Sequence, residues 1–135
     1  MDTAKCEALK RDLDSQPAPQ IVEISRFFDG NDDLASIGCN LSDHPGMDVF
    51  RTVLTRLVSR TDVRAVYAQI AELDPGEDSW PFTDTVLVVG SIPSEELERI
   101  LEPLMPDEVG LRDSSSLPGS LNEADRASTL VAWWD

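Results

Sequence analysis

Basic residues are scarce in this chain. It has 11 Lys and Arg against 26 Asp and Glu in 135 residues, which gives a formal net charge of -15. This charge argues against binding to nucleic acid or to an anionic membrane, because both require a basic protein surface. It favours a basic protein as partner, since opposite charges speed the encounter of two molecules. We therefore expect a protein partner of basic character, no nucleic-acid partner and no membrane partner.

Long apolar runs, cysteine clusters and cofactor-binding motifs are also lacking. No apolar run approaches the roughly 20 residues of a membrane span. The opening segment, MDTAKCEALKRDLD, is charged and helical instead of an apolar signal segment. Cys6 and Cys39 are too few for a disulfide framework, and CxxC, HExxH, GxGxxG and GxxxxGK do not occur. The sequence predicts a cytoplasmic protein with reduced cysteines, no metal and no cofactor.

What the chain does contain is enough apolar material for a core. The apolar fraction is 41%, with three Trp, four Phe and one Tyr, and the length suits a single domain. Cys6, Leu9 and Leu13 recur at helical spacing, and the two prolines of SQPAPQ follow them. We predict a peripheral N-terminal helix and linker over residues 1–19 and a single domain over residues 20–135.

Hydrophobic patterns divide the remaining chain into elements. The clearest helix covers residues 45–60, and a second covers about residues 94–102. We expect strands over residues 21–25, 34–40, 63–73, 83–92 and 128–135, and a loose segment over residues 107–127. This order predicts an α+β fold with a mostly antiparallel sheet of about five strands and helices packed on one face. Its expected core contains Phe50, Leu54, Leu57, Val86, Val88 and Ile100.

Residues 26–33, RFFDGNDD, allow two interpretations. The Asp-Gly pair at residues 29–30 suits a hairpin turn, but Ser25 could equally cap a helical turn that Gly30 ends. Asp29, Asn31 and Asp33 alternate as in a calcium loop, but the positions that require Gly and Glu hold Leu34 and Asn40. A polar turn in which Asp and Asn bind nearby amides is therefore the stronger interpretation.

Two further groups of residues have side chains that could carry chemistry or binding. A Cys39–His44 pair could act as nucleophile and base, but a core thiol and a histidine at a helix start explain the same residues without catalysis. No catalytic residue is assigned. The aromatic residues Trp80, Trp133 and Trp134 could anchor a partner or lie in the core. The candidate binding residues are Asp29, Asp32, Asp33, Glu77, Asp78, Trp80 and Trp134.

Several strings resemble a family of small bacterial proteins without assigned activity. They are DGNDDLASIGCNL, HPGMDVF, SWPFTDTVLVVGS, PDEVG and the closing WWD. The resemblance spans about residues 20–135 and leaves the first helix outside. It implies a bacterial origin and a cytosolic domain, and it supplies no catalytic residues.

Charge, small size and the absence of a catalytic signature favour a non-enzymatic acidic domain that binds a basic protein. An immunity protein that neutralises a basic toxin is the most concrete form of this hypothesis. The alternative is a small carboxylate- or metal-dependent enzyme, which would use the acids around residues 29–33 or 72–84. A homodimer is left open.

Overall fold

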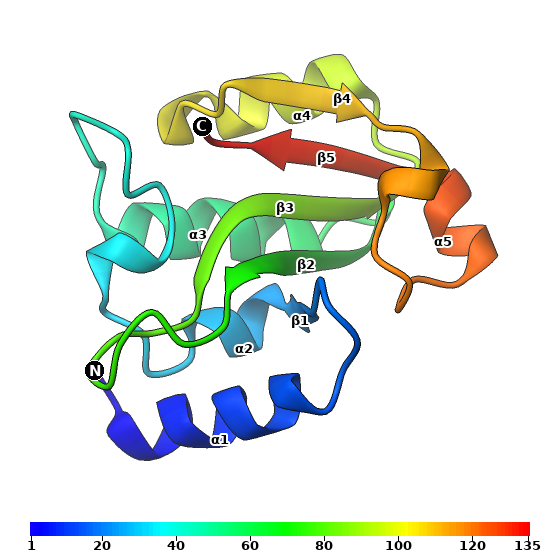
Figure 1. Cartoon of the computed structure of the whole chain (residues 1–135). Helices are drawn as coiled ribbons and strands as arrows, with labels where there is room; N and C mark the ends of the chain where they lie inside the picture. Colours follow the sequence, from blue (N-terminus) through cyan, green and yellow to red (C-terminus); the bar gives the residue numbers. More distant parts are fainter.

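The fold is a five-stranded antiparallel sheet with helices against one face (Figure 1). The computed structural model describes all residues, 1–135. The strand order is β1-β2-β3-β5-β4, so β1 and β4 are the two edges. The α+β prediction is confirmed. The elements are α1 (Thr3–Asp14), β1 (Ile21–Glu23), α2 (Ile24–Phe28), η1 (Leu34–Ser36), α3 (Met47–Val58), β2 (Val63–Glu72), β3 (Phe82–Gly90), α4 (Ser94–Leu101), η2 (Glu102–Leu104), β4 (Glu108–Leu111), η3 (Ser114–Ser116), α5 (Glu123–Ala127) and β5 (Thr129–Trp133).

The last strand of the chain is an interior strand of the sheet. β5 pairs with β3 on one side, where Val86 lies opposite Ala132, and with β4 on the other, where Val109 lies opposite the same alanine. The expectation that the final residues pair within the sheet is therefore confirmed. Of the two adjacent tryptophans, Trp134 is buried and Trp133 is partly exposed.

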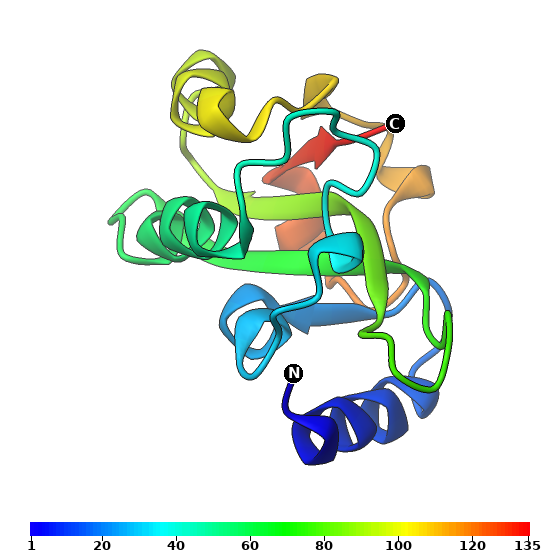
Figure 2. The ribbon, with the colours of Figure 1, turned by 90° about the vertical axis from the view of Figure 1, so that its left-hand side faces the viewer.

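The main core lies between the sheet and the helices. Figure 2 shows α2, α3 and α4 on one side of the sheet. Phe50, Leu54 and Leu57 of α3 are fully buried because they share one helical face, and they pack with Val86 and Val88 of β3 as predicted. α1 belongs to the same core through Cys6, Leu9 and Leu13. Ile100 is only partly buried against the core. None of the helices has both the length and the apolar character needed to cross a bilayer.

The opposite face of the sheet has a smaller apolar cluster. Leu117 and Leu121, which follow β4 in the chain, pack on Leu87 and Val131 of the sheet. Arg126 fastens this segment by donating hydrogen bonds to the backbone carbonyls of Ser114, Leu117, Pro118 and Leu121. The prediction that residues 107–127 form a loose segment is therefore wrong in part, since they contain β4 and α5.

The strand predicted over residues 34–40 is also wrong. Residues 34–36 form a single 3-10 turn, and only Ile37 makes an isolated bridge, to Thr83. Polar side chains explain the turn: Asp33 accepts a hydrogen bond from the Ala35 amide, and the buried Ser36 hydroxyl donates to the Asp33 carbonyl. Such local bonds compete with strand pairing.

Candidate functional site

The acids predicted to bind a partner are divided between ion pairs and free surface positions. Asp29 accepts a 2.7 Å hydrogen bond from Lys5 Nζ, and Asp32 accepts one of 2.9 Å from the N-terminal amine. The first bond raises the pKa of Lys5, and the second lowers the pKa of Asp32. Both contacts fasten α1 to the loop that follows α2. Glu77 and Asp78 are exposed in the loop between β2 and β3 and form no ion pair.

Two of the predicted binding residues from distant parts of the chain, Asp33 and Trp80, are in contact. Asp33 Oδ2 accepts a 3.0 Å hydrogen bond from the Trp80 backbone amide, while its Oδ1 caps η1. The indole of Trp80 is buried, and its Nε1 has no hydrogen-bond partner. Both residues line a hollow of about 250 Å³ together with Cys39. The contact between them joins two loops.

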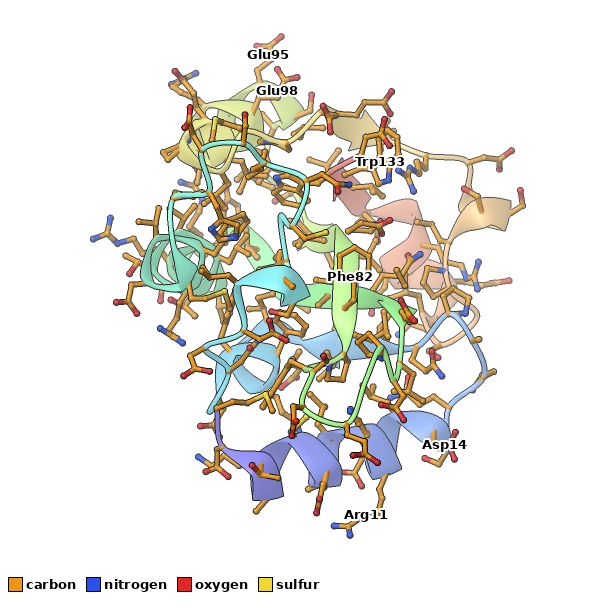
Figure 3. All side chains as sticks on the ribbon, turned by 60° about the vertical axis from the view of Figure 1, so that its left-hand side comes forward. Arg11, Asp14, Phe82, Glu95, Glu98 and Trp133 are labelled. Atoms are coloured by element: carbon orange, nitrogen blue, oxygen red, sulfur yellow. The ribbon has the colours of Figure 1, made fainter.

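Trp134 is buried in the main core. Its Nε1 donates a 2.8 Å hydrogen bond to the Leu104 carbonyl, and its ring centroid lies 5.9 Å from that of Phe50. Its side chain is 3% exposed, so the tryptophan that reaches the surface is Trp133, labelled in Figure 3. Nowhere do three or more His, Cys, Asp or Glu side chains converge in an arrangement that could hold a metal ion.

His44 makes structural contacts. Its Nδ1 accepts a 2.9 Å hydrogen bond from the Gly46 amide at the start of α3, and its Nε2 lies 2.8 Å from the Ile37 carbonyl. The neutral tautomer with a proton on Nε2 satisfies both contacts. The interpretation of Cys39 as a core thiol is wrong, because the predicted strand does not form and Cys39 is exposed, with its thiol 3.8 Å from the Asn40 side chain. The interpretation of His44 as a residue at a helix start is therefore the one that its contacts support.

A larger hollow lies elsewhere, between α4 and the edge strand β4. Its volume is about 690 Å³. We call it the β4 groove. The helical wall comes from α4 and η2, while β4 and its flanking residues form the other wall. The polar and exposed residues that line it are Glu98, Glu102, Asp107, Glu108, Leu111 and Arg112.

Four carboxylates of the β4 groove lack an ion pair. Glu98, Glu102, Asp107 and Glu108 make no contact with a Lys or Arg side chain, and the groove holds a single cation, Arg112. The one hydrogen bond to any of these carboxylates comes from the backbone amide of Asp135 to Asp107. Uncompensated negative charge therefore gathers at this edge of the sheet.

Some acids elsewhere on the surface are held in ion pairs. Arg60 binds Asp62 through two hydrogen bonds of 2.8 and 2.9 Å and reaches Glu96 at 3.0 Å. These bonds lower the pKa of Asp62 and raise that of Arg60. Other exposed acids, such as Glu77 and Asp78, lack an ion pair as the groove acids do, so the β4 groove is distinguished by its hollow beside an edge strand.

Sequence reasoning missed the β4 groove. The one signal in the sequence is the pair Glu98 and Glu102, two like charges four residues apart on a helix, an arrangement that mildly destabilises a helix. The other wall could not be recognised, because β4 lies within the segment predicted to be loose.

The comparisons with known proteins give a family and no activity. No curated protein and no solved structure matches the chain. One family model matches residues 4–128, so the match includes α1, which the resemblance from the sequence left outside, and ends before the two adjacent tryptophans. The matched residues make up most of the chain, and the chain therefore belongs to the uncharacterized protein YfbO family.

Proposed function

We propose that the protein is a non-catalytic domain that binds a basic protein partner through the β4 groove. The observation that carries this proposal is the gathering of four unpaired carboxylates around a hollow of about 690 Å³. A cationic side chain placed there would relieve the repulsion among these acids, and the net charge of -15 would speed its approach.

The type of partner follows from the residues of the groove. Carboxylates bind the ammonium group of Lys and the guanidinium group of Arg through charge-assisted hydrogen bonds. Met105, Val109 and Leu111 add apolar surface, against which the aliphatic stem of such a side chain can pack. A basic segment of a protein therefore suits the groove better than a small inorganic cation.

The proposal has a more specific form in which the partner is a basic toxin and this chain is its immunity protein. The net charge and small size support that form, since an acidic inhibitor can cover the active site of a basic enzyme. A bacterial, cytoplasmic setting belongs to the same proposal and rests on the resemblance of the SWPFTDTVLVVGS and PDEVG strings.

A pull-down from the native host tests the proposal with three baits. They are the wild-type chain, the groove variant Glu98→Gln/Glu102→Gln/Glu108→Gln, and the matched control Glu7→Gln/Glu77→Gln/Glu123→Gln, which removes the same charge from exposed acids elsewhere. We expect the wild type and the control to retain the same basic partner at low salt, and the groove variant to lose it.

Ionic strength gives the second readout of this experiment. Screening shortens the Debye length from about 10 Å at 0.1 M salt to about 3 Å at 1 M, so the complex should dissociate as salt rises. Equal retention by the groove variant and the control would contradict the proposal, as would a partner whose binding ignores salt.

A further inference from the structure

The two edge strands of the sheet differ in whether a side chain binds their outward backbone groups. At the β1 edge, the side-chain amide of Gln16 accepts a 3.2 Å hydrogen bond from the Ile21 amide and donates one of 3.1 Å to the Ile21 carbonyl. Gln16 thus takes the place that a neighbouring strand would occupy. At the β4 edge, no side chain binds the backbone of Glu108–Leu111, and Leu111 is 78% exposed. Only the β4 edge is open to a further strand.

The charges of the β4 edge select among strands that could add to it. A second copy of this chain would bring its own Asp107 and Glu108 to the same edge, and each copy carries a net charge of -15. Self-pairing is therefore opposed by repulsion between like charges. Pairing with a strand that carries basic side chains is favoured instead, since the four carboxylates of the groove attract such side chains.

We propose that an extended segment of the basic partner adds to β4 as a further strand, with Lys or Arg at positions i and i+2 facing Glu98 and Glu102. The inference rests on the proposed function and names how the β4 groove recognises its ligand. Main-chain hydrogen bonds to β4 would supply affinity, and the alternate side chains would supply specificity.

Spacing supports this register. Glu98 and Glu102 are four residues apart, and the helical backbone of α4 continues through Glu102. Four residues of a helix rise about 6 Å. In a strand, the side chains at i and i+2 lie on the same face about 6.8 Å apart. α4 runs behind β4 along its length (Figure 1), and both elements line the β4 groove. Alternate residues of an added strand can therefore reach both glutamates.

An NMR titration of the isotope-labelled chain with synthetic peptides tests the inference. The first peptide is acetyl-Thr-Val-Lys-Val-Lys-Val-Thr-amide, whose two lysines share one face of a strand. The second has the same composition with the two lysines adjacent, on opposite faces. Two further peptides carry the first sequence with backbone N-methyl groups on either the odd or the even residues. Each N-methyl set blocks the hydrogen bonds of one edge of the peptide.

We expect the alternating peptide to shift the resonances of β4 and α4 and to bind about tenfold more tightly than the adjacent-lysine peptide, a factor of the size given by one lost charged contact. One N-methylated peptide should lose binding, because its methyl groups face β4, and the other should keep it. Glu98→Gln/Glu102→Gln should weaken binding. The matched control Glu7→Gln/Glu123→Gln should not, since both of these exposed glutamates lie outside the groove lining.

Other outcomes separate the two proposals. Equal binding of all four peptides, weakened by Glu98→Gln/Glu102→Gln, would overturn strand addition and leave the basic-partner function intact. If neither the alternating nor the adjacent-lysine peptide shifts any groove resonance at low salt, strand addition and the basic-partner function are both contradicted. A second variant, Leu111→Lys, places a positive charge on the open edge and should repel the alternating peptide, whereas Leu111→Gln should not.

Discussion

The side-chain amide of Gln16 binds both backbone groups of Ile21 and so closes the β1 edge of the sheet. The glutamine lies in the SQPAPQ segment, whose prolines have no N–H with which to continue a ladder themselves. A single side chain therefore provides the hydrogen bonds that this stretch of backbone does not offer. This makes Gln16 the residue on which the order of β1 depends.

Gln16→Ala should lower the free energy of unfolding by about 1–3 kcal/mol, because it removes two hydrogen bonds and leaves partly buried backbone groups without partners. Urea denaturation of the purified chain measures this difference. Gln20→Ala is the matched control, since the Gln20 side chain makes no hydrogen bond, and it should change stability by less than about 0.5 kcal/mol. Equal effects of the two substitutions would show that Gln16 does not close the edge.

Leu54→Ala should destabilise the fold by about 2–5 kcal/mol, since Leu54 is fully buried between α3 and the sheet and its truncation leaves a cavity. Val58→Ala on the same helix provides the comparison, because Val58 is 48% exposed. Thermal or chemical unfolding of both variants checks the assignment of the buried face. If Leu54→Ala lowers the free energy of unfolding no more than Val58→Ala does, the assignment of the buried face of α3 is wrong.

Deletion of residues 128–135 should abolish cooperative unfolding. The deletion removes β5, which pairs with β3 and β4, and it also removes the hydrogen bond from Trp134 to Leu104. Deletion of Asp135 alone leaves the strand in place and should have a small effect. Near-ultraviolet circular dichroism during heating distinguishes the two. An unchanged melting temperature after the longer deletion would contradict the interior position of β5.

Asp62→Asn should flatten the acid limb of the stability curve. Hydrogen bonds from Arg60 lower the pKa of Asp62 in the folded chain, so this carboxylate binds its proton less readily when folded than when unfolded. Its stabilising contribution is complete above the unfolded pKa of about 3.9 and is lost as pH falls through the lower folded value. Unfolding measured from about pH 2 to pH 4 should therefore show a smaller slope for the variant.

Asp14→Asn serves as the control for that experiment, because Asp14 is exposed on α1 and has no ion pair (Figure 3). Its acid limb should follow that of the wild type. A slope that Asp62→Asn leaves unchanged would show that the contact with Arg60 adds nothing to stability.

Elements with strong periodicity could be predicted from the sequence. The helix over residues 3–14 and the strands near β2 and β3 have regular apolar spacing, and the structure places them close to the predicted bounds. For residues 26–33, a helical turn followed by Gly30 with φ 82° is correct, but α2 already begins at Ile24, so the strand predicted over residues 21–25 ends at Glu23 and Ser25 lies within the helix instead of capping it. Burial of Phe27 and Phe28 in the core favours this helix over a hairpin turn.

Elements that depend on distant partners could not be predicted. β4 contains Glu108 and Gly110, neither of which favours a strand, and it forms because β5 lies beside it. The candidate site has the same limitation, because the β4 groove exists only where α4 meets β4. The acids chosen from the sequence came from dense runs, and density gives no information about which acids lack a basic neighbour.

The interior position of β5 also has a consequence during protein synthesis. β3, which is buried along most of its length, is translated about 40 residues before β5, the strand that covers one of its sides. Until β5 leaves the ribosome, Val86–Val89 present an unpaired apolar edge, and β4 has no neighbour at all. During that interval the nascent chain can form non-native strand pairs. Binding by chaperones or rapid translation of the remaining residues would prevent such pairing.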